Sequence, residues 1–193
     1  MANRNSTGFG LIAQGTLGST PATGGQGKYY IVANYATSLY QGTTVKQSGG
    51  YVITAQAAIT NTSIGVLNGV FYNAATTEKP TWQNYYSQVT PANSENITAF
   101  VIDNPLQLYV TSFDTAIPIA NMGATFGMAT ITGSTLGGQA TNSMLLAGAS
   151  ATANTWRTVR IAEDPENKDI TAANCSVVVV QNLNQYNNGV TMA

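Results

Sequence analysis

The side chains that could do chemistry in this sequence are few, and they lack the usual proton carrier. The chain of 193 residues contains no histidine, which is the commonest general base and metal ligand in proteins. A Ser-His-Asp or Cys-His catalytic arrangement is therefore impossible. Cys175, the one cysteine, stands between Asn174 and Ser176 and has no basic neighbour in the sequence that could activate its thiol. We expect it to be a small buried strand residue and not a nucleophile.

Carboxylates and glycines offer a few further possibilities. Paired acids could hydrolyse glycosides, but no two of the eight Asp and Glu residues stand at a spacing that marks a catalytic pair. Calcium takes oxygen ligands, and segment 163–169 could supply them from Asp164, Glu166, Asn167 and Asp169, although it lacks the residue order of an EF-hand loop. The glycine-rich stretches lack the Gly-Lys-Ser/Thr ending of a phosphate-binding loop. The sequence predicts no enzyme, no cofactor site and no metal site, with calcium as the open alternative.

Charge is scarce along the whole chain. Seven basic and eight acidic residues make up 8% of it and give a net charge of −1, whereas globular proteins usually contain about 25% charged residues. The clustered Lys and Arg that bind nucleic acid are missing, and so is a basic amphipathic segment for a membrane surface, so we expect neither partner. Near-zero net charge favours association, and we expect a homotrimer. The single cysteine and the lack of a signal-peptide pattern predict synthesis in a reducing cytoplasm.

The first 27 residues differ in composition from the rest of the chain. They are rich in Gly, Ser and Thr and contain one short apolar patch, formed by Phe9, Leu11 and Ile12. Such a composition is typical of a flexible or extended arm. We predict an N-terminal arm over residues 1–27, with the three apolar residues as contacts to a neighbouring subunit, and a single domain over residues 28–193.

From Lys28 onward the pattern indicates β-structure. Tyr29 and Ile31 would lie on one face of an extended chain and Tyr30 and Val32 on the other, which is the two-residue periodicity of a β-strand. Turn signals such as Gly49-Gly50 separate further apolar runs, whereas the Ala-rich stretch 143–153 lacks an amphipathic stripe, so we expect at most one or two short helical turns. The predicted strands are Thr43–Lys46, Tyr51–Gln56, Ile64–Tyr72, Ile97–Ile102, Leu106–Phe113, Phe126–Thr132, Trp156–Ile161 and Ser176–Gln181. The predicted fold class is all-β, a β-barrel or β-sandwich of short antiparallel strands with an N-terminal extended arm.

Four aromatic residues are concentrated within fifteen positions: Tyr72, Trp82, Tyr85 and Tyr86. Aromatic side chains dominate protein cores and subunit interfaces, so we expect these four to pack at an interface. Exposed in a groove, the same rings could stack on sugars, which leaves a carbohydrate- or host-surface-binding module as the alternative.

Several segments, taken in order, resemble a family of small structural proteins of tailed bacteriophages of marine and freshwater bacteria. The resemblance spans most of residues 28–185, and its segments are Lys28-Tyr29-Tyr30-Ile31, Leu39-Tyr40-Gln41-Gly42, Gly50-Tyr51-Val52, Gly69-Val70-Phe71-Tyr72, Lys79-Pro80-Thr81-Trp82 with Tyr85-Tyr86, Ala99 to Pro105, Asn121-Met122-Gly123 and Arg160-Ile161 with Pro165-Glu166-Asn167.

Capsid decoration or cement proteins are the members of that family with the best-matching role. The resemblance implies a compact β-barrel or β-sandwich on the outer surface of the virion, in contact with the major capsid protein, and it brings no catalytic residues with it. A charge-poor surface suits such a role, because uncharged contacts resist changes in salt and many identical contacts on a shell add up. A tail or neck component of the virion is a further alternative.

Overall fold

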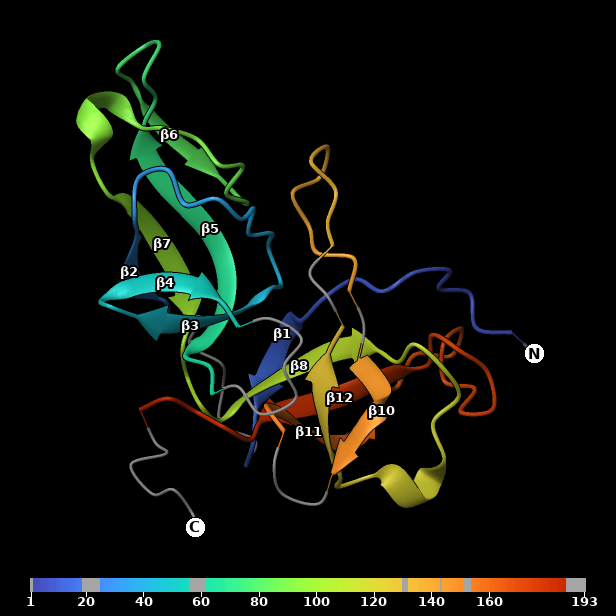
Figure 1. Cartoon of the computed structure of the whole chain (residues 1–193). Helices are drawn as coiled ribbons and strands as arrows, with labels where there is room; N and C mark the ends of the chain where they lie inside the picture. Colours follow the sequence, from blue (N-terminus) through green and yellow to red (C-terminus); the bar gives the residue numbers. More distant parts are fainter. Residues whose placement is uncertain are drawn as a thin grey trace.

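The computed structural model describes residues 2–18, 25–55, 62–129, 132–142, 144–150 and 154–186. Its regular structure consists of two antiparallel sheets and two short 3₁₀ turns, η1 (Ala92–Ser94) and η2 (Ile119–Asn121), as Figure 1 shows. The sheets form a sandwich-like arrangement and do not close into a barrel. The all-β fold class is therefore confirmed, in its sandwich form.

Sheet A contains six strands in the order β1-β8-β12-β11-β9-β10. Their bounds are Ile12–Thr16 (β1), Gln107–Ser112 (β8), Ser176–Gln181 (β12), Trp156–Ile161 (β11), Thr125–Met128 (β9) and Met144–Ser150 (β10). The two ends of the chain's described part thus meet in one sheet, because β1 and β12 both pair with β8.

Sheet B is built around one long strand, β5, whose two edges are used differently. One edge pairs with β7, while the other pairs with β3 at its start and with β6 at its end. The bounds are Gly27–Ile31 (β2), Thr44–Ser48 (β3), Tyr51–Thr54 (β4), Gly65–Asn73 (β5), Pro80–Gln83 (β6) and Ile97–Ile102 (β7). The order across the main path is β2-β7-β5-β3-β4.

Period-two alternation decides which side of sheet B is buried. In β7 the residues Ile97, Ala99 and Val101 are fully buried, while the residues between them are half-exposed. Strand β12 is different, because all six of its residues are buried. Its odd-numbered valines join the core on the inner face of sheet A, and its even-numbered ones join a smaller apolar cluster on the outer face.

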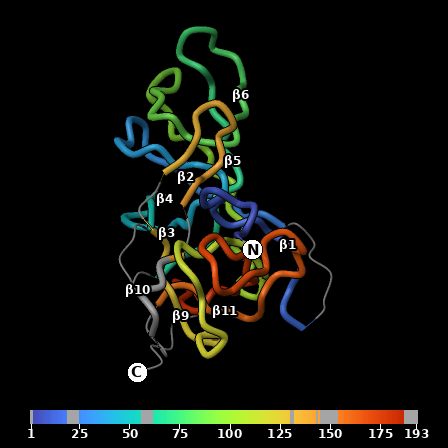
Figure 2. The backbone as a smooth tube through the Cα atoms, turned by 90° about the vertical axis from the view of Figure 1, so that its right-hand side faces the viewer, coloured from blue at the N-terminus to red at the C-terminus, as the bar shows by residue number. Residues whose placement is uncertain are grey.

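Buried polar contacts connect the two sheets. The indole N–H of Trp156 in β11 donates to the hydroxyl of Thr44 in β3 at 3.0 Å, and the hydroxyl of Tyr109 in β8 donates to a carbonyl in β7 at 3.1 Å. The segment 132–142 adds a third connection, since it extends from sheet A alongside sheet B in both Figure 1 and Figure 2. There Gln41 N–H donates to the carbonyl of Gly138 at 2.8 Å.

Strands predicted from β-branched and aromatic alternation are all present, with boundaries shifted by a few residues. Parts of two predicted strands, Gln56 and residues 130–131, lie outside the described residues. Three strands were not predicted: β1, β6 and β10. Each is a peripheral strand that contains Gly, Ala or Pro, so its strand conformation depends on the neighbouring strand more than on its own propensity.

The N-terminal segment is extended, as expected, and it lies on the chain's own sheet A. Residues 12–16 form β1, and Leu11 N–H donates to the carbonyl of Gly42 at 3.1 Å. Gly42 has φ +87° and lies against the backbone of Leu11, where a side chain would be both strained and crowded. Within residues 2–18, the arm is therefore part of the folded domain; residues 1 and 19–24 of the predicted arm lie outside the described residues.

Across the part of the chain that the structure describes, no helix has the length and hydropathy needed to cross a bilayer.

Candidate interaction surfaces

The reactive side chains considered in the sequence do not gather into a site. Cys175 is fully buried, as predicted, although it lies just before β12 and not within a strand. Burial, with a smaller effect of the Asp169 charge, raises the pKa of its thiol. A protonated, enclosed thiol is a poor nucleophile. Among the described residues, no three His, Cys, Asp or Glu side chains come close enough together to hold a metal ion. Asp164 instead accepts a hydrogen bond from the side chain of Asn167 at 2.7 Å, which closes its own loop.

The outer face of sheet B carries a row of side chains across four neighbouring strands. Tyr30 lies opposite Thr98, Thr98 opposite Phe71, and Phe71 opposite Trp82. Directly opposed residues in an antiparallel pair share a face of the sheet, so these four side chains point the same way. The exposed fractions of Tyr30, Phe71 and Trp82 are 56%, 40% and 50%. Adjoining exposed aromatic side chains of this size are typical of interaction surfaces.

A second row lies beside the first and completes what we call the aromatic face: Tyr30, Phe71, Trp82 and Phe100. Phe100 pairs with Lys28 on one side and with Gly69 on the other. The rings of Trp82 and Phe100 are 5.0 Å apart at a tilt of 58°, and the Lys28 ammonium lies 5.9 Å from the centre of the Phe100 ring. Lys28 is the charged side chain of these two rows, so the aromatic face is apolar with one positive edge.

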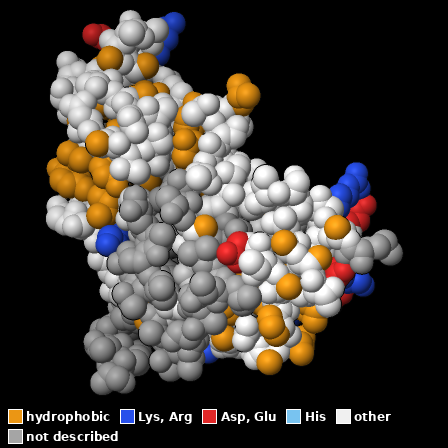
Figure 3. Space-filling view, turned by 45° about the vertical axis from the view of Figure 1, so that its right-hand side comes forward, with side chains coloured by type: hydrophobic (Ala, Val, Ile, Leu, Met, Phe, Trp, Pro, Cys, Tyr) orange, Lys and Arg blue, Asp and Glu red, His pale blue; other side chains and the backbone are white. Residues whose placement is uncertain are grey.

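The surface around these residues is poor in charge. In Figure 3 most visible atoms belong to neutral side chains or backbone, and hydrophobic side chains form a patch on the upper half of the molecule, the half built around sheet B. Charged side chains are most concentrated at the end that carries the N-terminal segment, and others lie at the opposite tip and at the lower edge of the hydrophobic patch. On the face drawn in Figure 3, the scarcity of charge in the sequence therefore appears as large areas of neutral surface.

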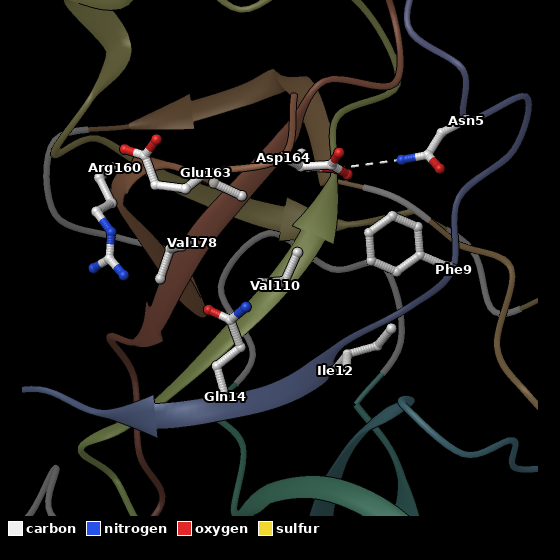
Figure 4. Close-up of a pocket in the computed structure, with 11 residues that line it drawn as sticks. Asn5, Phe9, Ile12, Gln14, Val110, Arg160, Glu163, Asp164 and Val178 are labelled. Atoms are coloured by element: carbon white, nitrogen blue, oxygen red, sulfur yellow. Dashed lines mark hydrogen bonds between the residues drawn. The ribbon is translucent and has the colours of Figure 1, made fainter. Parts of the chain in front are cut away.

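A groove of about 650 Å³ lies on the outer face of sheet A, which we call the sheet A groove. Its floor follows one cross-strand row, in which Ile12 lies opposite Val110, Val110 opposite Val178, and Val178 opposite Arg160. Figure 4 shows Phe9 and Ile12 on one side of this floor and Arg160 on the other, with Glu163 and Asp164 above it. The groove therefore combines an apolar floor with a polar and charged rim, the usual make-up of a binding pocket.

Asparagines hold the N-terminal wall of this groove in place. The Asn3 side chain donates to the carbonyls of Asp169 and Ala173, both at 2.9 Å, and accepts the Asp169 N–H at 2.9 Å. The Asn5 side chain donates to the hydroxyl of Ser176 at 3.2 Å, the contact drawn in Figure 4. Arg4, which lies between these asparagines in the sequence, forms an ion pair with Glu166, with a guanidinium nitrogen 2.6 Å from a carboxylate oxygen. Both side chains are exposed, so the pair adds little stability.

Of the seven interface residues predicted from sequence, three are buried in the chain's own core. Leu11, Tyr72 and Tyr86 have exposed fractions of 3%, 7% and 0%. They stabilise the fold and have no surface to offer a partner, which corrects the expectation for these three. Tyr86 shows why: its hydroxyl donates to the carbonyl of Tyr35 at 2.8 Å while the ring stacks on that of Tyr35.

The other four predicted residues reach the surface, but in separate places. Trp82 belongs to the aromatic face, and Phe9 and Ile12 line the sheet A groove. Tyr85 is half-buried and stacks on Tyr40, with ring centres 6.1 Å apart.

Sequence reasoning missed Tyr30, Phe71 and Phe100 as surface residues. Each stands next to a buried strand residue, and the signal that could have found them was the period-two alternation already read at Tyr29 to Val32.

Comparisons with protein-family models, with curated proteins and with solved structures found no match to this chain. The fold and the two surfaces therefore carry the functional argument.

Proposed function

We propose that the protein is a structural component of a tailed-bacteriophage virion that decorates the outer face of the capsid and stabilises adjacent capsomers. It is made in the cytoplasm of the host bacterium and binds the major capsid protein. Two features support the proposal: the ordered segments that resemble such proteins, and a folded β-sandwich that carries apolar side chains in a row on the outer face of each sheet. The proposal gives the molecule a binding role and assigns it no reaction.

One observation carries it: the apolar row on the outer face of sheet A. The inner face of this sheet already packs on a complete core, yet Ile12, Val110 and Val178 form a second hydrophobic row on the other side. Val178 is buried within this row, while the half-buried Val110 and the exposed Ile12 keep surface for a partner. Ile12 is 45% exposed. Covering apolar surface contributes about 25 cal/mol per Å², so a partner that fills the groove would be held by its apolar contacts.

The charges around this stripe carry both signs, which matters for a protein on a virion. The groove rim holds Arg160, Glu163 and Asp164, which carry both signs. Screening by salt weakens contacts between exposed charges far more than it weakens apolar contacts. Binding through the sheet A groove should therefore persist at high ionic strength, and the many copies on a lattice would add their individually weak contacts.

The proposal is tested with phage heads that lack their decoration protein. Purified protein is added, the heads are washed in high salt, and bound copies per head are measured by gel densitometry. We expect high occupancy for the unaltered protein and a loss of about tenfold or more in affinity for Ile12→Asn, since a polar side chain would face the apolar floor. The matched control is Leu136→Asn, another exposed aliphatic residue that lies outside the groove lining.

Two results would overturn it. Heads that bind no protein would exclude capsid decoration, and a few copies per virion would indicate a tail or neck component instead. Equal occupancy for Ile12→Asn and Leu136→Asn would remove the sheet A groove as the docking surface. Sedimentation of the free protein tests the expected homotrimer, which a monomer at all concentrations would contradict.

A further inference from the structure

The aromatic face of sheet B serves neither the core nor the sheet A groove. It lies on the other sheet, where three of its rings are exposed and the fourth, Phe100, is half-buried between them. We propose that the aromatic face is a saccharide-binding surface, on which a pyranose ring of an oligosaccharide stacks on Trp82. This inference goes beyond capsid decoration and does not depend on it.

The position of the indole ring is the first argument. Trp82 lies over Gly69, so that a Cβ built on Gly69 would be 2.8 Å from Cη2 of the ring. The benzo part of the indole therefore covers a residue of β5 that has no side chain to displace it. With Phe100 packed 5.0 Å away, the ring is supported from below and from one side. Its 50% exposure then comes from the side that faces solvent.

An indole held in this way is suited to a sugar. The C–H face of a pyranose packs on the flat face of an aromatic ring, and its hydroxyls need hydrogen-bonding groups around that ring. A protein partner usually engages an aromatic anchor by enclosing it in a desolvated pocket. Trp82 is instead fixed against its own sheet, and fixing a binding group beforehand lowers the entropic cost of binding.

Polar groups flank the ring at distances that suit an oligosaccharide. From β6 to β2 the row crosses three strand spacings, about 14 Å in all, which is longer than one sugar. Thr98 and Tyr30 contribute hydroxyl groups along this row, and Lys28 contributes an ammonium group over Phe100. These groups can bond sugar hydroxyls, and Lys28 can also bond the carboxylate of an acidic sugar. We therefore assign the surface to pyranose oligomers that are neutral or carry a few acidic groups.

The two tryptophans make the proposal directly testable on the free protein. Trp156 is fully buried, whereas Trp82 is half-exposed, so acrylamide quenching of fluorescence reports mainly on Trp82. Cellohexaose, chitohexaose and a galacturonate hexamer are titrated separately as probes. We expect at least one of them to protect Trp82 from quenching and to shift the NMR signals of Tyr30 and Phe100.

Variants separate stacking from general effects. Trp82→Ala should lower the affinity for the bound hexamer at least about tenfold, while Trp82→Phe, which keeps a ring, should retain part of it. Leu136→Ala serves as the matched control, because it removes an exposed apolar side chain that belongs to neither surface. Thermal unfolding of each variant shows whether the fold is kept, and Trp82→Phe keeps the test valid if the alanine variant is unstable.

Failure of all three hexamers to bind at millimolar concentration would overturn the proposal. So would binding that Trp82→Ala leaves unchanged. If Trp82→Ala reduced occupancy on phage heads while no hexamer bound, the aromatic face would be a protein-docking surface, and the saccharide proposal would be wrong. Because the titration uses no heads, its result is independent of the capsid experiment.

Discussion

Trp156 and Thr44 join the two sheets through a hydrogen bond in the interior of the protein. The indole N–H donates to the threonine hydroxyl at 3.0 Å, and the exposed fractions of the two residues are 0% and 3%. Tyr109 packs edge-on against the indole, with ring centres 5.2 Å apart. A buried indole N–H needs an acceptor, and Thr44 supplies it from the opposite sheet. The bond therefore fixes how the two sheets pack together, in addition to stabilising each of them.

The first prediction is that Thr44→Val destabilises the protein although its volume hardly changes. The substitution leaves the Trp156 N–H buried without its acceptor, which costs about 1–3 kcal/mol. Urea unfolding followed by circular dichroism measures the change in the free energy of unfolding. Thr111→Val is the matched control: Thr111 is equally buried, and its hydroxyl has no hydrogen-bond partner within the described part of the chain. That control should be neutral or stabilising, and equal losses in both variants would contradict the prediction.

Gly69 gives the second prediction, which concerns the position of Trp82. Gly69→Ala places a methyl group where the indole lies, so the ring must move away from the sheet. We expect stronger acrylamide quenching of Trp82 and, for any saccharide that binds, an affinity lowered by about fivefold or more. Gly137→Ala is the control, since a Cβ there meets no atom within 4 Å. Unchanged quenching in Gly69→Ala would show that the indole is not supported by the sheet.

The third prediction is a loss of stability in alkali. Burial raises the pKa of Tyr109, and burial together with the hydrogen bond to Asp103 raises that of Tyr29; burial also raises the pKa of Tyr72 and Tyr86. In the unfolded chain these groups titrate near 10. Above that pH the folded state binds more protons than the unfolded state, so the free energy of unfolding falls as pH rises.

Urea midpoints measured between about pH 8 and pH 11 check this expectation. With no histidine in the chain, stability should stay nearly constant from about pH 6 to pH 8. The buried Cys175 thiol, whose pKa is also raised, adds to the loss above that range. Tyr109→Phe should weaken the alkaline drop, since it removes one of the raised groups. A stability that does not change up to pH 11 would contradict the assignment.

Asp169 provides the fourth prediction, at the acid end. Hydrogen bonds from the hydroxyl and the backbone N–H of Thr171 lower the pKa of this carboxyl from 3.8 to about 2. The stabilisation it provides is complete above its ordinary pKa and is lost as pH falls from about 4 towards 2. Asp169→Asn should therefore reduce the steepness of acid unfolding in this range. Because the carboxyl is exposed, the effect on the urea midpoint should be small, and no difference between the two proteins would contradict the prediction.

Much of the sandwich could be predicted from the sequence, because most strands are runs of β-branched and aromatic residues that lie between turn signals. Strands such as β7 also show which residues point inward, since their polar and apolar residues alternate. The run 177–180 could not be oriented in this way. All four valines are buried, two on each face of sheet A, and a strand that is apolar on both faces carries no alternation.

The candidate surfaces were harder to predict for a related reason. Phe71 and Tyr72 are adjacent aromatic residues, and so are Tyr85 and Tyr86. In each pair the structure buries the tyrosine at the higher number and leaves its neighbour in contact with solvent. Which member points inward depends on the register in which the strand or bridge pairs with its neighbours. That register cannot be predicted from the residue types alone. The sheet A groove depends even more on chain pairing, because it combines residues near both ends of the chain.

The asparagine contacts of the N-terminal segment have a consequence for biosynthesis. Asn3 bonds to residues that lie 166 and 170 positions further along the chain, and β1 must wait for β8 before it can pair. During translation β1 therefore has no partner in its sheet until β8 has been made. Sheet A can be completed only after β12 has been made, and such distant pairings slow folding and prolong the exposure of unpaired strands. A chain truncated before β12 should consequently remain bound to chaperones and fail to accumulate as a soluble fragment.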